Sequence, residues 1–133
     1  MWWGCLVAGL MGGVCSPALA ASYTFPGALP SGCLLGLAGV YTCGTVNLGA
    51  SDTVTISGAA VITTTGNLSI QGSQINAGGA AANLTLNVGG TLSASAGAKV
   101  VGQVNAASVN TIGAQTFTGN IAVTSALGTL TLG

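Results

Sequence analysis

The chain has 133 residues, of which 50% are hydrophobic, 5% aromatic and only 2% charged, and its formal net charge is zero. With one acid, Asp52, one base, Lys99, and no histidine, it lacks the neighbouring titratable groups that acid-base catalysis, nucleophile activation and hard-metal binding require. We therefore expect no enzyme and no catalytic, cofactor-binding or metal-binding residues. We also expect no nucleic-acid partner, because a phosphate backbone needs basic side chains.

The first twenty residues predict an export leader. An apolar run ends in Pro17 and then Ala18-Leu19-Ala20, the small-x-small form of a signal peptidase site, which places cleavage between Ala20 and Ala21. The run has no basic n-region, and the alternatives are a membrane anchor or lipidation at Cys15. The leader predicts an exported protein, at the bacterial cell surface or outside the cell, that meets the membrane only through this segment before cleavage.

Leader removal leaves one pair of cysteines, Cys33 and Cys43. A pair in an oxidising compartment indicates a disulfide, which would stabilise a hairpin by about 3 kcal/mol in the loop-entropy model. Two thiolates without a third ligand do not complete a zinc site. The apolar stretch between them, residues 34–40, must pack on the rest of the fold or on a partner.

Residues 21–44 predict an N-terminal cap with a disulfide hairpin. This turn-rich segment carries the cap aromatics Tyr23, Phe25 and Tyr41 near the cysteine pair. Large rings and a disulfide can cover the open end of a sheet, where unpaired backbone groups would otherwise face water. The predicted organisation is therefore a signal peptide over 1–20, this cap over 21–44 and a solenoid over 45–133.

Residues 45–133 alternate short strands with glycine turns. Val54 and Ile56 alternate with threonines, and Leu84 and Leu86 alternate with asparagine and threonine, which indicates strands with one buried face. Such short strands predict an all-β fold, a right-handed parallel β-solenoid (β-helix) whose coils share stability with their neighbours. The alternative is an antiparallel β-sandwich, which normally has longer strands and more charge on its open faces.

A weak internal repeat is visible at an offset of 29 residues. The sequence of residues 74–77 matches that of 103–106, and 90–92 matches 119–121 at the same offset. The related stretch 66–68 lies only 24 residues before 90–92. Two matches at one offset favour a true repeat.

The two charged side chains have ordinary structural explanations. Asp52 lies between Ser51 and Thr53 and is expected to start a turn or cap a strand. One carboxylate cannot form the pair that glycosidases use. Lys99 is the only base that could activate a serine, and we expect no such role.

Several stretches of the chain resemble a known family. They are Ser22-Tyr23-Thr24-Phe25-Pro26-Gly27-Ala28-Leu29-Pro30-Ser31-Gly32-Cys33, Tyr41-Thr42-Cys43-Gly44, Asp52-Thr53-Val54-Thr55-Ile56, Ile75-Asn76-Ala77-Gly78-Gly79 and Asn83-Leu84-Thr85-Leu86. These stretches are similar to the start of the mannose-sensitive haemagglutinin (MSHA) pilus biogenesis protein Q family, large exported proteins encoded with type IV pili. The resemblance implies a cell-surface or pilus-associated role without catalytic residues. The chain departs from the family in its apolar 34–40 loop and in stopping at Gly133.

The combined prediction is a non-catalytic structural or adhesive surface module. Its expected partners are further copies of the chain, pilus or cell-surface proteins, or a glycan. Residues 130–132 predict an uncharged last strand that invites another strand, as a truncation, a domain junction or a polymerisation surface. The alternative is an ice- or carbohydrate-binding solenoid, because threonine pairs such as Thr53/Thr55 can order water on a flat sheet.

Overall fold

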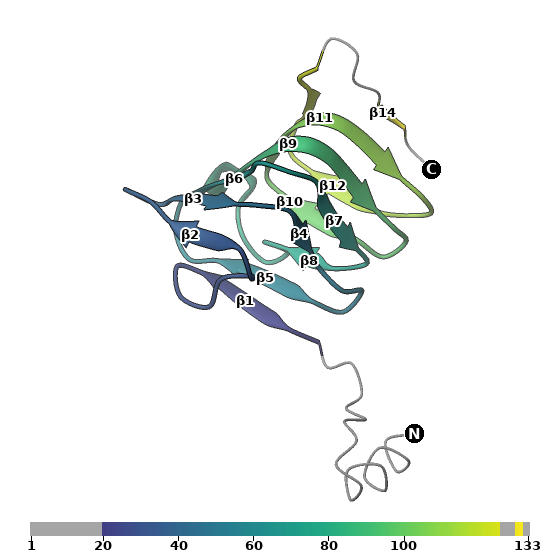
Figure 1. Ribbon diagram of the computed structural model, residues 1–133. Coiled ribbons are helices and arrows are strands. Elements are labelled where there is room, and N and C mark those ends of the chain that lie inside the picture. The colour runs from purple at the N-terminus through teal and green to yellow at the C-terminus, as the bar shows by residue number, and fades with distance from the viewer. Residues whose placement is uncertain (1–19, 126–129, 132–133) are drawn as a thin grey trace, which may run out of the picture.

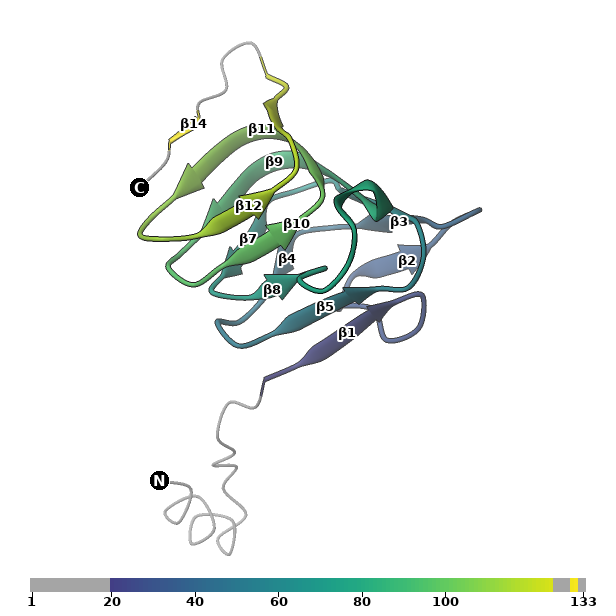
Figure 2. The ribbon, with the colours of Figure 1, turned by 180° about the vertical axis from the view of Figure 1, so that it is seen from behind.

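The computed structural model describes residues 20–125 and the backbone of 130–131. This part of the chain is nearly all β and forms about 4 turns of stacked parallel strands (Figure 1 and Figure 2). The predicted β-solenoid is therefore confirmed, and the antiparallel sandwich is wrong because nearly every strand pair is parallel. The predicted signal peptide lies outside the described residues except for Ala20.

The first side of the solenoid is a five-stranded parallel sheet. Its strands, in spatial order, are β1 (Ser22–Phe25), β5 (Thr53–Ile56), β8 (Gln74–Ile75), β10 (Lys99–Val101) and β12 (Thr116–Thr118). One inward-facing residue of each strand stacks on the next, in the row Tyr23, Val54, Ile75, Val100 and Phe117. This stacked row is the reason for the alternating pattern in the sequence.

The other sheet supplies the second and third sides. Its main path consists of β13 (Ile121–Val123), β11 (Gln103–Thr111), β9 (Leu84–Ala94), β6 (Ala60–Thr64), β3 (Val40–Cys43) and β2 (Cys33–Leu35). Short strands on the third side are β4 (Val46–Asn47), β7 (Leu68–Gln71) and β14 (Leu130–Thr131). The long strands β9 and β11 pass around the corner, so that β9 pairs first with β6 and then with β7.

Glycine makes the corner in β9 possible. A Cβ atom on Gly89 would lie 2.9 Å from the carbonyl oxygens of Thr64 and Thr65, closer than packed atoms allow. At the corresponding corner of β11 the register shifts between Ala106 and Ser108, because that corner has one residue fewer. Coils of different length therefore stack on one another.

The predicted 29-residue repeat is wrong as a coil length. On the third side, Leu68 pairs with Val46, Leu92 with Leu68 and Val109 with Leu92, which are spacings of 22, 24 and 17 residues. Gln103 pairs with Thr85 rather than stacking on Gln74. The shorter 24-residue offset is the one that the fold uses, between β7 and β9. A loop after β8, which includes the 3-10 helix η1 (Ala81–Asn83), lengthens that coil.

The segment predicted as a cap also builds the first coil. β1 pairs with β5, and β3 pairs with β6, so residues 21–44 are continuous with the solenoid rather than a separate unit. The rings of Phe25 and Tyr41 meet edge to face at 4.7 Å between centroids and are each only 2% exposed. They extend the core to its N-terminal end, where Tyr23 is half-buried.

Candidate functional site

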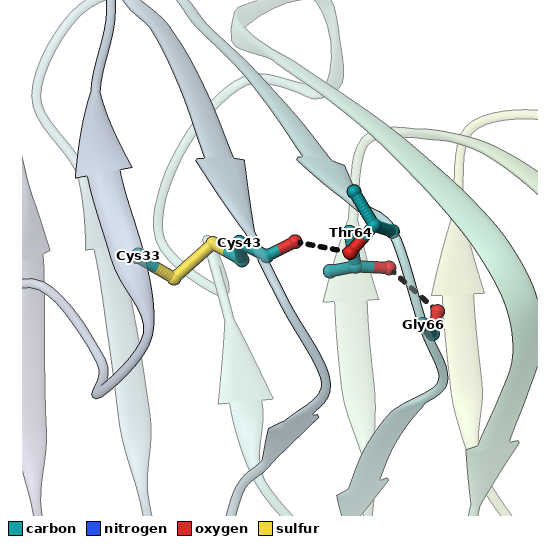
Figure 3. Close-up of a disulfide and its surroundings, with 5 residues drawn as sticks. Cys33, Cys43, Thr64 and Gly66 are labelled. Carbon is teal, nitrogen blue, oxygen red and sulfur yellow. Dashed lines mark hydrogen bonds between the residues drawn. A yellow bond between two sulfur atoms is a disulfide. The ribbon is translucent and has the colours of Figure 1, made fainter.

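The predicted disulfide is present between Cys33 of β2 and Cys43 of β3. The two residues face each other in an antiparallel hairpin, and Figure 3 shows the bond joining the neighbouring strands. The carbonyl oxygen of Cys43 accepts from the backbone N–H of Thr65 on the next coil at 2.8 Å. The disulfide therefore attaches β2 to a strand that is itself fixed to the solenoid.

The hairpin beyond the disulfide is apolar and exposed. Leu34, Leu35 and Leu37 are 73%, 59% and 87% exposed, and Val40 is 40% exposed. In both views the hairpin tip extends past the stacked coils (Figure 1 and Figure 2). Of the two packing arrangements that the sequence allowed for residues 34–40, packing on the solenoid is therefore excluded for these leucines.

The tip of this hairpin is a tight turn with two left-handed residues. Ala38 has φ +54° and Gly39 has φ +77°, and the backbone N–H of Val40 donates to the carbonyl of Leu37 at 3.1 Å. Two successive positive φ values define a type I′ turn, which suits the twist of a hairpin. Glycine adopts this conformation without a steric penalty, whereas alanine at position 38 incurs one through its Cβ atom.

The backbone of β2 has one open side. Gly44 donates to the carbonyl of Gly32 and Gly36 to that of Val40, so alternation in an antiparallel pair makes Leu34 the bonded residue between them. The N–H and C=O of Leu35 consequently point away from β3. No strand among the described residues pairs with β2 on that side.

The carboxylate of Asp52 holds together a turn and the start of the first strand. Its Oδ2 accepts from the backbone N–H of Gly49 at 2.6 Å, and its Oδ1 accepts from that of Ala21 at 2.8 Å. The residue closes the turn that begins at Gly49 and directly precedes β5. The expectation of a turn or strand-cap role agrees with these contacts, although Asp52 ends the turn instead of starting it.

Lys99 lies on the outer surface of the first side, away from Asp52 along the strand ladder. It is registered between Gln74 of β8 and Thr116 of β12, in an outward row that also contains Ser22 and Thr53. Within residues 20–125 no group of three His, Cys, Asp or Glu side chains could hold a metal. The sheet surface around Lys99 is polar but otherwise uncharged.

Outward-facing asparagines connect coils on the second side. Asn105 donates from Nδ2 to Oδ1 of Asn87 at 2.9 Å, and these residues are in register with Thr63. The arrangement is a short amide ladder of the kind that stacked coils support. The ladder lies on the outer surface of the strands, where the hydrogen bond joins the amide side chains of two successive coils.

Asn76 supports a surface hollow near the first side. Its side chain is 3% exposed, its φ is +53°, and its loop bounds a hollow of about 270 Å³ against Val54, Thr55 and Ile56 of β5. No role was predicted for Asn76 from its residue type alone. Its position before Ala77-Gly78-Gly79 was the available signal, since asparagine tolerates left-handed backbone next to a glycine turn.

Comparisons of the chain with protein-family models, curated proteins and solved structures each found no match. Over the described ranges, no helix is long and apolar enough to cross a membrane. The fold and its surfaces therefore place the chain in a structural class, that of a disulfide-containing β-solenoid with a projecting apolar hairpin.

Proposed function

We propose that the chain is an exported, non-catalytic structural module of the bacterial cell surface that associates, through strand pairing, with further copies or with pilus proteins. The observation that carries this proposal is the open edge of β2 on the projecting hairpin. The resemblance to the MSHA pilus biogenesis protein Q family supports the pilus-associated setting.

The open edge offers both hydrogen bonds and apolar area. The N–H and C=O of Leu35 need partners once water is removed, and only another extended strand supplies both in register. The exposed leucines beside them would each contribute about 2 kcal/mol when buried. A strand with exposed apolar side chains is therefore the partner that this surface fits.

The edge also lacks the features that normally prevent strand pairing. Native sheets protect an edge with lysine, proline or inward-pointing charge, whereas residues 33–40 contain none of these. Antiparallel pairing of β2 with β2 of another copy is self-complementary, as a twofold interface requires. Neither copy brings a charge to the hairpin that would oppose this contact.

Sedimentation velocity of the exported chain over a range of concentrations tests the association. Leu35→Pro removes the outward N–H but not a bond to β3, because proline is tolerated at a strand edge whose N–H faces outward. We expect the unmodified chain to associate and the Leu35→Pro chain to stay monomeric. Leu37→Ser is the matched control, since it removes a more exposed leucine and leaves the β2 backbone intact.

Association lost equally in the Leu35→Pro and Leu37→Ser chains would show general apolar adhesion instead of strand pairing. A monomeric unmodified chain that also fails to bind pilus proteins would contradict the proposed function. Circular dichroism of each variant establishes that the solenoid is retained.

The ice- or carbohydrate-binding alternative has less support. Thr53 and Thr55 face outward on β5, but the next strands in that sheet present Gln74 and then Lys99 in the same row. The pair Thr53/Thr55 therefore does not continue into a regular row of threonines. Thermal hysteresis or binding on a glycan array would favour this alternative.

A further inference from the structure

We propose that cleavage after Ala20 creates an ionic anchor, in which the new α-ammonium group of Ala21 binds the carboxylate of Asp52, the only acidic side chain of the protein. The inference depends on the export that the proposed function includes, but not on association through β2. It assigns the position of the mature N-terminus and a role for the single acid.

The backbone of Ala21 is already held on both sides. Its nitrogen lies 2.8 Å from Oδ1 of Asp52, and its carbonyl accepts from the N–H of Thr53 at 2.9 Å. The pairing of β1 with β5 begins at the next residue, Ser22 with Thr53. Among the described residues, Ala21 is therefore the first whose backbone bonds to the solenoid.

The side chain of Asp52 is held in place by contacts that do not depend on a charged partner. The residue is only 9% exposed, its Oδ2 is engaged by Gly49, and its own carbonyl accepts from Gln74 on the next coil at 2.9 Å. These contacts direct the other oxygen, Oδ1, at Ala21. Oδ1 accepts from this one backbone nitrogen, and a buried carboxylate is better satisfied by a cation there, because charge-assisted hydrogen bonds are the stronger kind.

Cleavage supplies that cation without moving the backbone. Hydrolysis of the Ala20–Ala21 bond consumes one water, leaves a carboxylate on Ala20 of the leader, and leaves on Ala21 an amine that is protonated at neutral pH. Ala20 is exposed, so the residue on the leader side of this bond is open to solvent. Cleavage one residue later would remove Ala21 and leave Oδ1 of Asp52 without this donor.

The first test is the mass of the exported protein, which should correspond to a chain beginning at Ala21. The second is a thermal double-mutant cycle of four chains: the mature chain and one extended by Gly-Ser before Ala21, each with and without Asp52→Asn. We expect Asp52→Asn to lower the melting temperature by about 5 °C more in the mature chain than in the extended one. An equal loss in both chains, or a mature N-terminus elsewhere, overturns the proposal.

If Asp52→Asn prevents folding, a pH series on the mature and extended chains that retain Asp52 provides a second test. An α-amino group has an ordinary pKa of about 7.7–8.0, and a neighbouring carboxylate raises the folded-state pKa. The stabilisation is then complete below the unfolded pKa and is lost as the pH rises through the folded pKa. The mature chain should therefore melt above the extended chain at pH 7, and this difference should shrink as the pH rises above about 8.

Asp52 is the one titratable side chain shown to hydrogen-bond to Ala21 among the described residues. Tyr23 of β1 faces inward in the row with Val54, and Lys99 lies on β10, two strands from β5. A difference in melting temperature that does not change with pH would overturn the anchor. A chain that stays monomeric but shows this pH dependence would contradict the proposed association and leave the anchor in place.

Discussion

The side chain of Asn76 bonds to the backbone at Val101 on the next coil: Nδ2 donates to the carbonyl oxygen of Val101 at 2.8 Å. The same nitrogen donates to the carbonyl of Ala80 at 3.0 Å, and the residue is 3% exposed. One buried amide thus satisfies two main-chain acceptors and fixes the loop after β8 against β10.

Asn76→Asp should destabilise the protein by about 3 kcal/mol, because a buried carboxylate cannot donate to either carbonyl. Aspartate accepts the positive φ of this position as asparagine does, so the substitution isolates the loss of the amide. Urea unfolding measures the change. Asn47→Asp, on the exposed surface of β4, is the control and should change stability by less than about 0.5 kcal/mol.

Leu92→Ala should cost about 3–5 kcal/mol, because Leu92 is fully buried between Leu68 and Val109 in the third-side stack. Leu34→Ala removes the same atoms from a side chain that is 73% exposed and should have almost no effect on the monomer. Chemical unfolding of both variants below the association range separates the two cases. Equal losses would contradict the assignment of core and surface.

Ala38→Gly should stabilise the hairpin by about 0.5–1 kcal/mol, since it removes a Cβ atom from a residue with φ +54°. Ala114→Gly is the control. Ala114 is exposed and does not have a positive φ, so glycine there should destabilise by a similar amount through the entropy of the unfolded chain. Differential scanning calorimetry should show melting temperatures that move in opposite directions.

Replacement of both Cys33 and Cys43 by alanine should lower the free energy of unfolding by about 2–4 kcal/mol. β3 remains paired with β6 without the disulfide, so the parallel coils should persist while β2 loosens. A reductant should produce the same loss in the unmodified chain and no further loss in the double variant. A complete loss of β structure on reduction would show that the disulfide holds the whole solenoid.

The sequence predicted the parallel solenoid and the disulfide because both depend on local patterns. Inward residues such as Leu84, Leu86 and Val88 alternate along one strand, and this alternation survives any change in coil length. The coil length itself was not predictable from similarity, because the corners at Gly89–Gly90 and Ala107 differ by one residue and the loop after β8 adds further residues to one coil. The sequence matches at an offset of 29 residues arose because the chain is rich in a few residue types.

The surface features of the fold were harder to predict from the sequence than its core. The apolar stretch 34–40 was evident, but only the register of β2 against β3 shows that Leu35 points its backbone outward. The contact between Ala21 and Asp52 likewise depends on the parallel pairing of β1 with β5. Such contacts between coils follow from register, which single-sequence patterns do not fix when the coils differ in length.

Amide hydrogen exchange at Leu34 and Leu35 tests the central claim most directly. The N–H of Leu34 bonds to β3 within the hairpin, whereas that of Leu35 faces the open edge. We predict that protection of the Leu35 amide rises with protein concentration while that of Leu34 stays constant. A Leu35 amide that exchanges equally fast at all concentrations, in a chain that nevertheless associates, would contradict strand pairing at β2.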